Sequence, residues 1–263
     1  LERNNHSAEI VKAKGNHWKV DFHLPPNRPL ICIVFYGQCH QTVDVTIKNI
    51  EQNTAYENYI IYLPKDWRAD KRGCRTWNQS IHLNSQLCGD YTLLIQDKII
   101  PKRKNWLTEL IKAVQCSNTA FVGPRLFCKD NGKNFSSGMV FSEDAIKPLY
   151  ENYESSFPGI HYRIHINHSF VSLHPSCLLI DTSKLENFTI INFNTLLKYL
   201  FILNEMGIYN TYVPSSECFI DINPKVHLNV YELKQYLLYS QDHIDCSFNS
   251  NLKICNGEIL LNS

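Results

Sequence analysis

Three polar side chains, Gln96, Asp97 and Lys98, come directly after a short apolar run that covers residues 91–95. That run has the length and composition of a buried strand in an α/β sheet. In open α/β sheets, ligands bind just beyond the carboxyl ends of the strands, so these side chains stand where chemistry is expected. We therefore expect the rest of the chain to serve as the scaffold for this edge.

The overall composition narrows the class of protein. The 263 residues are 44% hydrophobic, which is enough to bury the core of a large α/β domain. The formal net charge is only +1, so no global field draws the chain to nucleic acid. No apolar run reaches about 18 residues, so no membrane span is expected. The chain begins at Leu1 rather than at methionine, and we expect a fragment of a longer protein; its localisation stays unknown, with the cytoplasm slightly favoured.

Cysteine and histidine spacing argues against two kinds of metal site. The ten cysteines form no Cys-x-x-Cys pair, so a zinc ribbon is not expected. Cys32 and Cys177 lie in apolar runs, which is typical of buried thiols, while some disulfides remain the alternative. The eleven histidines contain no HExxH motif, so a histidine metal site is not expected either.

The periodicity of apolar residues predicts strands and helices that alternate through the first half of the chain and mix with antiparallel pieces in the second. The predicted strands cover residues 30–36, 59–63, 91–95, 119–122, 138–141, 177–180 and 209–213. The predicted helices cover residues 42–53, 76–87, 105–115, 196–206 and 231–240. We expect an N-terminal arm at 1–29, one domain at 30–228, and a C-terminal helix and tail at 229–263.

Eight short segments follow one another between residues 18 and 221: PPNRPLI (25–31), AYENYII (55–61), GDY (89–91), WLTEL (106–110), VGPRL (122–126), GMVF (138–141), SCLLI (176–180) and NEMGIY (204–209). In this order they resemble the family-two glycosyltransferases, in particular the rhamnosyltransferase-like members. The resemblance implies the GT-A fold of nucleotide-diphospho-sugar transferases, an α/β fold with a mixed central sheet flanked by helices. It also implies a nucleotide sugar as donor and a glycan or a protein as acceptor.

The acids on which this family's chemistry depends are missing from the chain. The metal-binding Asp-x-Asp of the family aligns with Gln96 and Lys98, so that only the middle residue, Asp97, is acidic. Near the position of the aspartate that holds the nucleotide base stand Pro64 and Lys65. An ammonium group at a ligand position repels a divalent cation. We therefore expect no cofactor and no divalent metal.

Two further departures concern the acceptor side of the site. Residues 192–196, where the family carries an acidic pair that includes the general base, contain no carboxylate, and neither Asn nor Thr can take a proton from an acceptor hydroxyl. Residues 219–221 stand where a histidine is common. These losses within a preserved hydrophobic frame predict a degenerate domain that acts as a structural or interaction module of a larger glycan-synthesising protein. Its expected partners are other domains of the same chain or a partner glycosyltransferase.

Two alternatives stay open. The first is an active, metal-independent glycosyltransferase in which basic side chains supply the positive charge at the diphosphate. Its candidate nucleotide-binding residues are Tyr36, Lys65, Arg68, Gln96, Asp97 and Lys98, and its candidate catalytic residues are Asp97, His174 and Glu186. The second is a glycan-binding module that uses the aromatic helix at 231–240, although aromatic residues at helical spacing more often belong to a core.

Overall fold

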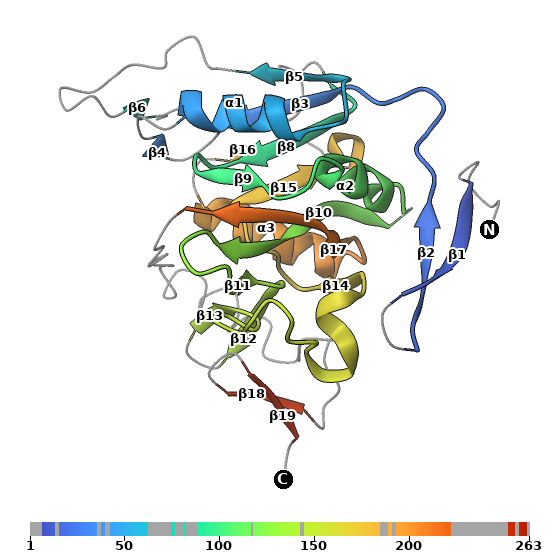
Figure 1. Ribbon diagram of the computed structural model, residues 1–263, viewed down its shortest axis with the longest axis vertical. Helices are drawn as coiled ribbons and strands as arrows, with labels where there is room; N and C mark the ends of the chain where they lie inside the picture. Colours follow the sequence, from blue (N-terminus) through green and yellow to red (C-terminus); the bar gives the residue numbers. More distant parts are fainter. Residues whose placement is uncertain are drawn as a thin grey trace.

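The centre of the protein is a mixed β-sheet with helices on both faces (Figure 1). The computed structural model describes residues 7–13, 16–35, 38–39, 43–62, 75–76, 81–82, 89–116, 118–142, 145–184, 189–190, 193–221, 252–255 and 258–261. The main path of the sheet is β14 (His168–Phe170), β17 (Tyr209–Ile220), β10 (Thr119–Cys128), β15 (Cys177–Ile180), β8 (Tyr91–Ile95), β3 (Ile31–Phe35) and β5 (Tyr59–Tyr62). Two short strands, β11 (Asn134–Ser136) and β9 (Ile99–Pro101), add to β10 and β17.

The strand directions decide which chain segments meet at one edge. Strand β3 pairs in parallel with both β5 and β8, and β10 pairs in parallel with β17. Strand β15 runs antiparallel to both of its neighbours, β8 and β10. The strands β3, β5, β8, β10 and β17 therefore all point the same way, and the chain that leaves their carboxyl ends gathers at a single edge. Residues 96–98 lie at that edge, as predicted.

Both faces of the sheet are covered, and the sequence of β3 shows how. Ile31, Ile33 and Phe35 face a cluster that includes α1 (Val43–Asn53) and α2 (Trp106–Val114). Cys32 and Val34 face the other cluster, which includes α3 (Phe193–Glu205). Side chains alternate between the faces of a strand, so a strand buried on both faces must be apolar throughout, as this one is.

Most predicted elements are confirmed, and one is wrong. The strands β3, β5, β8, β12 and β15 and the helices α1, α2 and α3 match their predicted positions, whereas β10 and β17 extend well beyond theirs. The predicted helix at 76–87 is wrong where the structure describes it, because β6 (Arg75–Thr76) and β7 (Ile81–His82) are strands. They pair with β4 (Gln38–Cys39) and β16 (Thr189–Ile190), and such long-range pairing overrides local helix preference. The predicted helix at 231–240 lies outside the described residues.

Three hairpins stand apart from the central sheet. The segment predicted as a polar arm contains β1 (Ala8–Lys12) and β2 (Trp18–Phe22), which pair antiparallel. The other two are β12 (Met139–Ser142) with β13 (Ala145–Pro148), and β18 (Leu252–Cys255) with β19 (Glu258–Leu261). Two short 3-10 helices cover Ile160–His165 and Thr182–Lys184. Among the described helices, none is both long enough and apolar enough to cross a bilayer.

Two glycines in left-handed conformations make a matched pair for a stability test. Gly138 has a φ of +107°, and a Cβ there would collide with the ring of the buried Phe170. Gly132 has a φ of +69°, but a Cβ there would meet no atom. We expect Gly132→Ala to lower the free energy of unfolding by about 1 kcal/mol, the cost of the backbone conformation alone. Gly138→Ala should lower it by about 3 kcal/mol, because overpacking adds to that cost.

Urea denaturation of both variants at one temperature measures these two free energies. An equal loss of unfolding free energy in the two variants would show that the Phe170 ring does not pack against Gly138.

Candidate functional site

The turn between β8 and β9 is fixed from two sides through the backbone of Lys98. Lys98 has a φ of 70°, a left-handed conformation that costs a residue other than glycine about 1 kcal/mol or more. Its N–H donates to the Thr46 hydroxyl of α1 at 3.0 Å, and its carbonyl accepts from the Asp221 N–H at 3.1 Å. The hydrogen bonds from α1 and from the end of β17 thus stabilise a backbone conformation that is unfavourable by itself.

The three predicted side chains at this turn have different surroundings. Asp97 is only 3% exposed, whereas Gln96 and Lys98 are half-buried. The Gln96 side-chain carbonyl accepts from the Ser176 hydroxyl at 2.8 Å, and the Gln96 N–H donates to the Ser176 carbonyl at 2.9 Å. The end of β8 is therefore joined to the start of β15, and the carboxylate of the trio lies inside rather than at the rim.

His174 lies two residues before Ser176, close to the same junction, but it is 5% exposed. Its ring meets the edge of the Phe135 ring at a centroid distance of 5.1 Å, and its Nδ1 accepts from the Ser176 N–H at 3.4 Å. Burial lowers the pKa of His174 to about 3. The imidazole is therefore neutral at physiological pH and is a weak base, since general bases work best with a pKa near the operating pH.

The remaining sequence candidates, Tyr36, Lys65, Arg68 and Glu186, lie outside the described residues. In their place the structure brings Asp221 to the edge, beside Lys98, although the two are far apart in the sequence. The Asp221 carboxylate pairs with the Lys129 ammonium at 2.6 Å. The parallel pairing of β10 with β17 is the signal that places the residue after β17 at this edge.

A divalent metal at this edge would need a hard-cation site. Such ions prefer several carboxylate and carbonyl oxygens. Within the described residues, no group of three His, Cys, Asp or Glu side chains could hold a metal ion. The Asp221 N–H binds the carbonyl of Lys98 at this edge, but the Asp221 carboxylate already pairs with Lys129. The described part of the chain does not by itself form a complete cation site.

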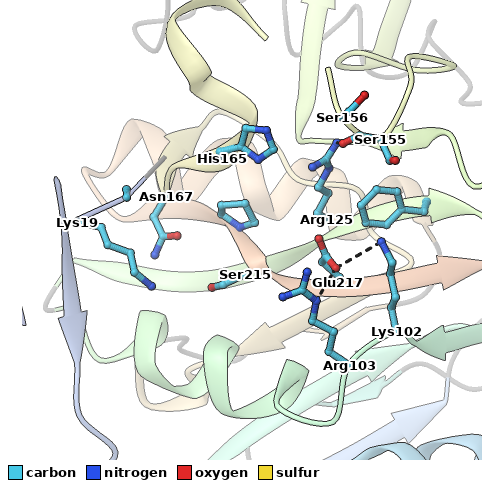
Figure 2. Close-up of a pocket in the computed structure, with 13 residues that line it drawn as sticks. Lys19, Lys102, Arg103, Arg125, Ser155, Ser156, His165, Asn167, Ser215 and Glu217 are labelled. Atoms are coloured by element: carbon cyan, nitrogen blue, oxygen red, sulfur yellow. Dashed lines mark hydrogen bonds and ion pairs between the residues drawn. The ribbon is translucent and has the colours of Figure 1, made fainter. Parts of the chain in front are cut away.

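A polar pocket of about 370 Å³ lies at the other end of β9 (Figure 2). The Glu217 carboxylate of β17 is its only acidic lining group among the described residues, and its Oε2 lies 2.8 Å from Arg103 Nε and 3.4 Å from Lys102 Nζ. Further polar groups reach the pocket from β2, β10, β17 and the segment around the 3-10 helix: Lys19, Arg125, Ser155, Ser156, His165, Asn167 and Ser215.

Arg125 forms the back of this pocket and is only 2% exposed. Its Nε donates to the Asn134 side-chain carbonyl at 2.9 Å, and its Nη2 donates to the Ser155 carbonyl at 3.0 Å. Burial lowers the pKa of Arg125, while Glu217 acts in the opposite direction. Arginine stays protonated in proteins, so the pocket has a fixed positive charge at its back.

Comparisons with known proteins support the fold and go no further. No protein-family profile and no curated protein sequence matches the chain. A crystal structure of GalNAc-T7 with UDP, GalNAc and Mn2+ matches at a TM-score of 0.50 and 11% identity, over 80% of this chain and 45% of that one. A mannosyltransferase, PcManGT from Pyrobaculum calidifontis in complex with GDP-Man and Mn2+, matches at a TM-score of 0.47 and 9% identity. The match covers 84% of this chain and 67% of that one.

The chain has the GT-A glycosyltransferase fold, with a mixed central sheet and few helices. It spans less than half the length of the GalNAc-T7 chain. The expectation of no cofactor and no divalent metal is wrong, because the GalNAc-T7 structure, which has the same fold, was crystallised with Mn2+ and UDP. That expectation rested on the sequence after β8 and after β5, and of these positions Pro64 and Lys65 lie outside the described residues.

His174 gives a test of this junction through pH. Its pKa is lowered in the fold to about 3 from an unfolded value of 6.5, so below pH 6.5 the unfolded chain binds a proton that the folded chain does not. Stability should therefore fall as the pH drops from 6.5 towards 3. This histidine alone contributes about 1.4 kcal/mol per pH unit well below 6.5.

The comparison is between the native chain and His174→Gln, which cannot titrate. Urea denaturation at pH values from neutrality down to about 5, above most carboxylate titrations, should show a shallower loss of stability for the variant. Identical pH slopes for the two proteins would mean that His174 is accessible to protons in the fold.

Proposed function

We propose that this chain is a degenerate family-two glycosyltransferase domain, close to the rhamnosyltransferase-like members, that has lost transfer chemistry. It would act as a structural or interaction module of a larger glycan-synthesising protein, with residues 30–228 as the domain. Other domains of that protein or a partner glycosyltransferase would be its partners. A protein can keep its fold after it loses its catalytic activity, because the residues that pack the core are not those that react.

One observation carries this proposal. In the turn after β8, the only carboxylate, Asp97, is 3% exposed, and the accessible side chains belong to Gln96 and Lys98. Gln96 already uses its carbonyl oxygen to accept from Ser176. The part of the edge that a diphosphate would approach thus presents an engaged amide and a cation, which can attract an anion but cannot take a proton.

The acceptor side supports the same proposal. Inverting transfer needs a base within hydrogen-bond reach of the attacking hydroxyl and with a pKa near the operating pH. His174 is buried, and its pKa of about 3 is far from that range. Residues 192–196 offer no carboxylate. Among the described residues, neither of these places supplies an effective base.

A second candidate is an active glycosyltransferase that moves a sugar from a nucleotide sugar to a glycan or a protein. The observation in its favour is Asp221, whose N–H donates to the Lys98 carbonyl, so that a second acidic residue joins the edge at which Asp97 lies. In this case Asp97 and Asp221 would be the acids on which turnover depends.

Turnover decides between the two. The chain is incubated with UDP-, GDP- and dTDP-sugars in the presence of Mn2+, and the release of nucleoside diphosphate is measured with and without glycan acceptors. We expect no release above that of Asp97→Asn, because the turn after β8 presents no exposed acid.

Matched thermal unfolding of the native chain and Asp97→Asn confirms that both are folded in the assay. Release by the native chain that falls about a hundredfold or more in Asp97→Asn would contradict the proposal and support the active enzyme, since catalytic acids and bases contribute on that scale.

A further inference from the structure

The polar pocket beyond β9 carries an excess of positive charge that the sheet-edge site does not explain. Its cationic lining groups are Lys19, Lys102, Arg103 and Arg125, and the carboxylate among its lining residues is Glu217. The Lys102 N–H also donates to the Glu217 backbone carbonyl at 2.9 Å. This bond fixes the start of the segment between β9 and α2 against β17. The pocket lies four residues along β9 from the turn at Lys98, roughly 13 Å for an extended strand.

Glu217 pairs with Lys102 and Arg103, and an aromatic ring and neutral groups hold Lys102 and Arg125 as well. Lys102 Nζ lies 3.8 Å from the centre of the Phe127 ring, and the Arg125 guanidinium carbon lies 4.6 Å from the same centre. Arg125 cannot turn away, because Asn134 and Ser155 bind two of its nitrogens. Like charges that line one pocket repel one another, and an anion in the pocket would relieve that repulsion.

The remaining lining suits a small, hydroxylated ligand. Ser155, Ser156, Asn167 and Ser215 place hydroxyl and amide groups around the cations (Figure 2). The volume of about 370 Å³ falls in the range of small-molecule sites, about 300–1,000 Å³, and exceeds what a lone phosphate needs. Lys102, Arg103 and Arg125 lie at one side of the pocket and Lys19 at the other (Figure 2), and together with the neutral donors they match a phosphate on a sugar-sized body.

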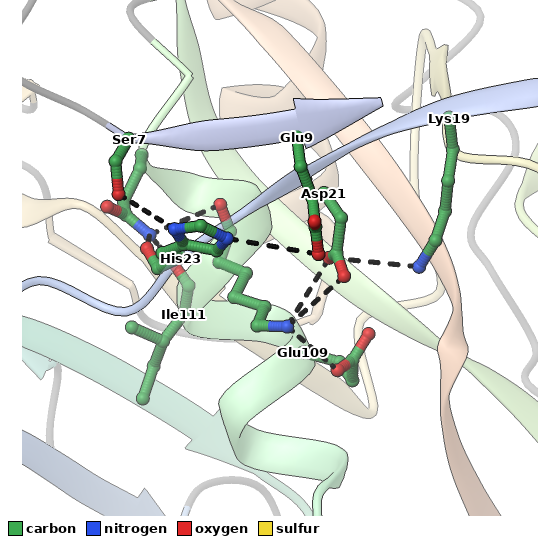
Figure 3. Close-up of polar contacts among 9 residues, drawn as sticks. Ser7, Glu9, Lys19, Asp21, His23, Glu109 and Ile111 are labelled. Atoms are coloured by element: carbon green, nitrogen blue, oxygen red, sulfur yellow. Dashed lines mark hydrogen bonds and ion pairs between the residues drawn. The ribbon is translucent and has the colours of Figure 1, made fainter. Parts of the chain in front are cut away.

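Strand β2, which carries Lys19, is held against the domain by polar contacts (Figure 3). Asp21 of β2 lies 3.3 Å from Lys112 Nζ of α2 and 3.8 Å from Lys19 Nζ. Gln115 Nε2 donates to the His23 carbonyl at 3.2 Å, which fixes the chain just after the hairpin. Lys19 therefore faces the pocket from a positioned strand rather than from a loose arm.

We propose that this pocket binds a sugar monophosphate, with its cations on the phosphate and its serine and asparagine side chains on the sugar hydroxyls. This site is separate from the proposed glycosyltransferase edge and does not depend on transfer activity. Lys102 and Arg103 contact the ligand from the β9–α2 connection, Arg125 from the back and Lys19 from the hairpin. Glu217 competes with the phosphate for Lys102 and Arg103.

The test is isothermal titration of the full chain with glucose 6-phosphate, inorganic phosphate and glucose at low ionic strength. We expect glucose 6-phosphate to bind, inorganic phosphate to bind about tenfold more weakly, and glucose to give no signal, since charged hydrogen bonds outweigh neutral ones. Arg103→Gln and Lys102→Gln should each weaken binding about tenfold. Glu217→Gln should strengthen it, because a competing negative charge is removed.

Lys48→Gln, which removes an exposed cation from α1 outside the pocket, is the matched control and should leave the affinity unchanged. No binding of either phosphate-bearing probe would overturn the proposal. Binding that falls equally in Lys48→Gln and Arg103→Gln would overturn it as well, and so would weaker binding by Glu217→Gln. Equal affinity for glucose 6-phosphate and inorganic phosphate would assign the pocket to the free anion and overturn its sugar part.

Discussion

Two hydrogen bonds to the backbone of Lys98 are the constraint on which the sheet edge depends. The N–H of Lys98 is bound by Thr46 of α1, and its carbonyl by the N–H of Asp221 after β17. These bonds hold a non-glycine residue in a left-handed conformation, and they place Asp97 inside the turn while Lys98 stays half-exposed. The same constraint explains why Thr46 is a buried polar residue on the inner face of α1.

Strand β9 connects this edge to the polar pocket. It begins after the turn at Lys98, pairs with β17 over Cys218–Ile220, and ends just before Lys102 and Arg103. The same segment of β17 supplies Glu217 to the pocket and leads to Asp221 at the edge. This pair of strands therefore fixes the relative positions of two chemically different sites: an edge whose turn after β8 presents no accessible carboxylate, and a pocket rich in cations.

The sequence predicts the buried frame well because apolar runs report burial directly. The run at 31–35 is apolar throughout, and the structure buries both of its faces. The helix predicted at 76–87 fails because β6 and β7 pair with strands from distant segments, and no local pattern encodes a distant partner. For the same reason Asp221 and the cations of the pocket escape sequence reasoning: Lys19, Lys102 and Arg125 come from three separate elements, and only the topology brings them together.

The central claim is that the frame of a sugar-nucleotide fold persists while an accessible acid is missing at the end of β8. Returning an acid to that place tests it most directly. Lys98→Asp keeps a residue type that tolerates the left-handed conformation and replaces a cation with a carboxylate. Titration of Mn2+ with UDP should show binding at least about tenfold tighter for this variant than for the native chain, whereas Lys12→Asp on the distant hairpin should change nothing. Unchanged binding by Lys98→Asp would contradict the account, because the missing acid would then not be what separates this edge from a working one.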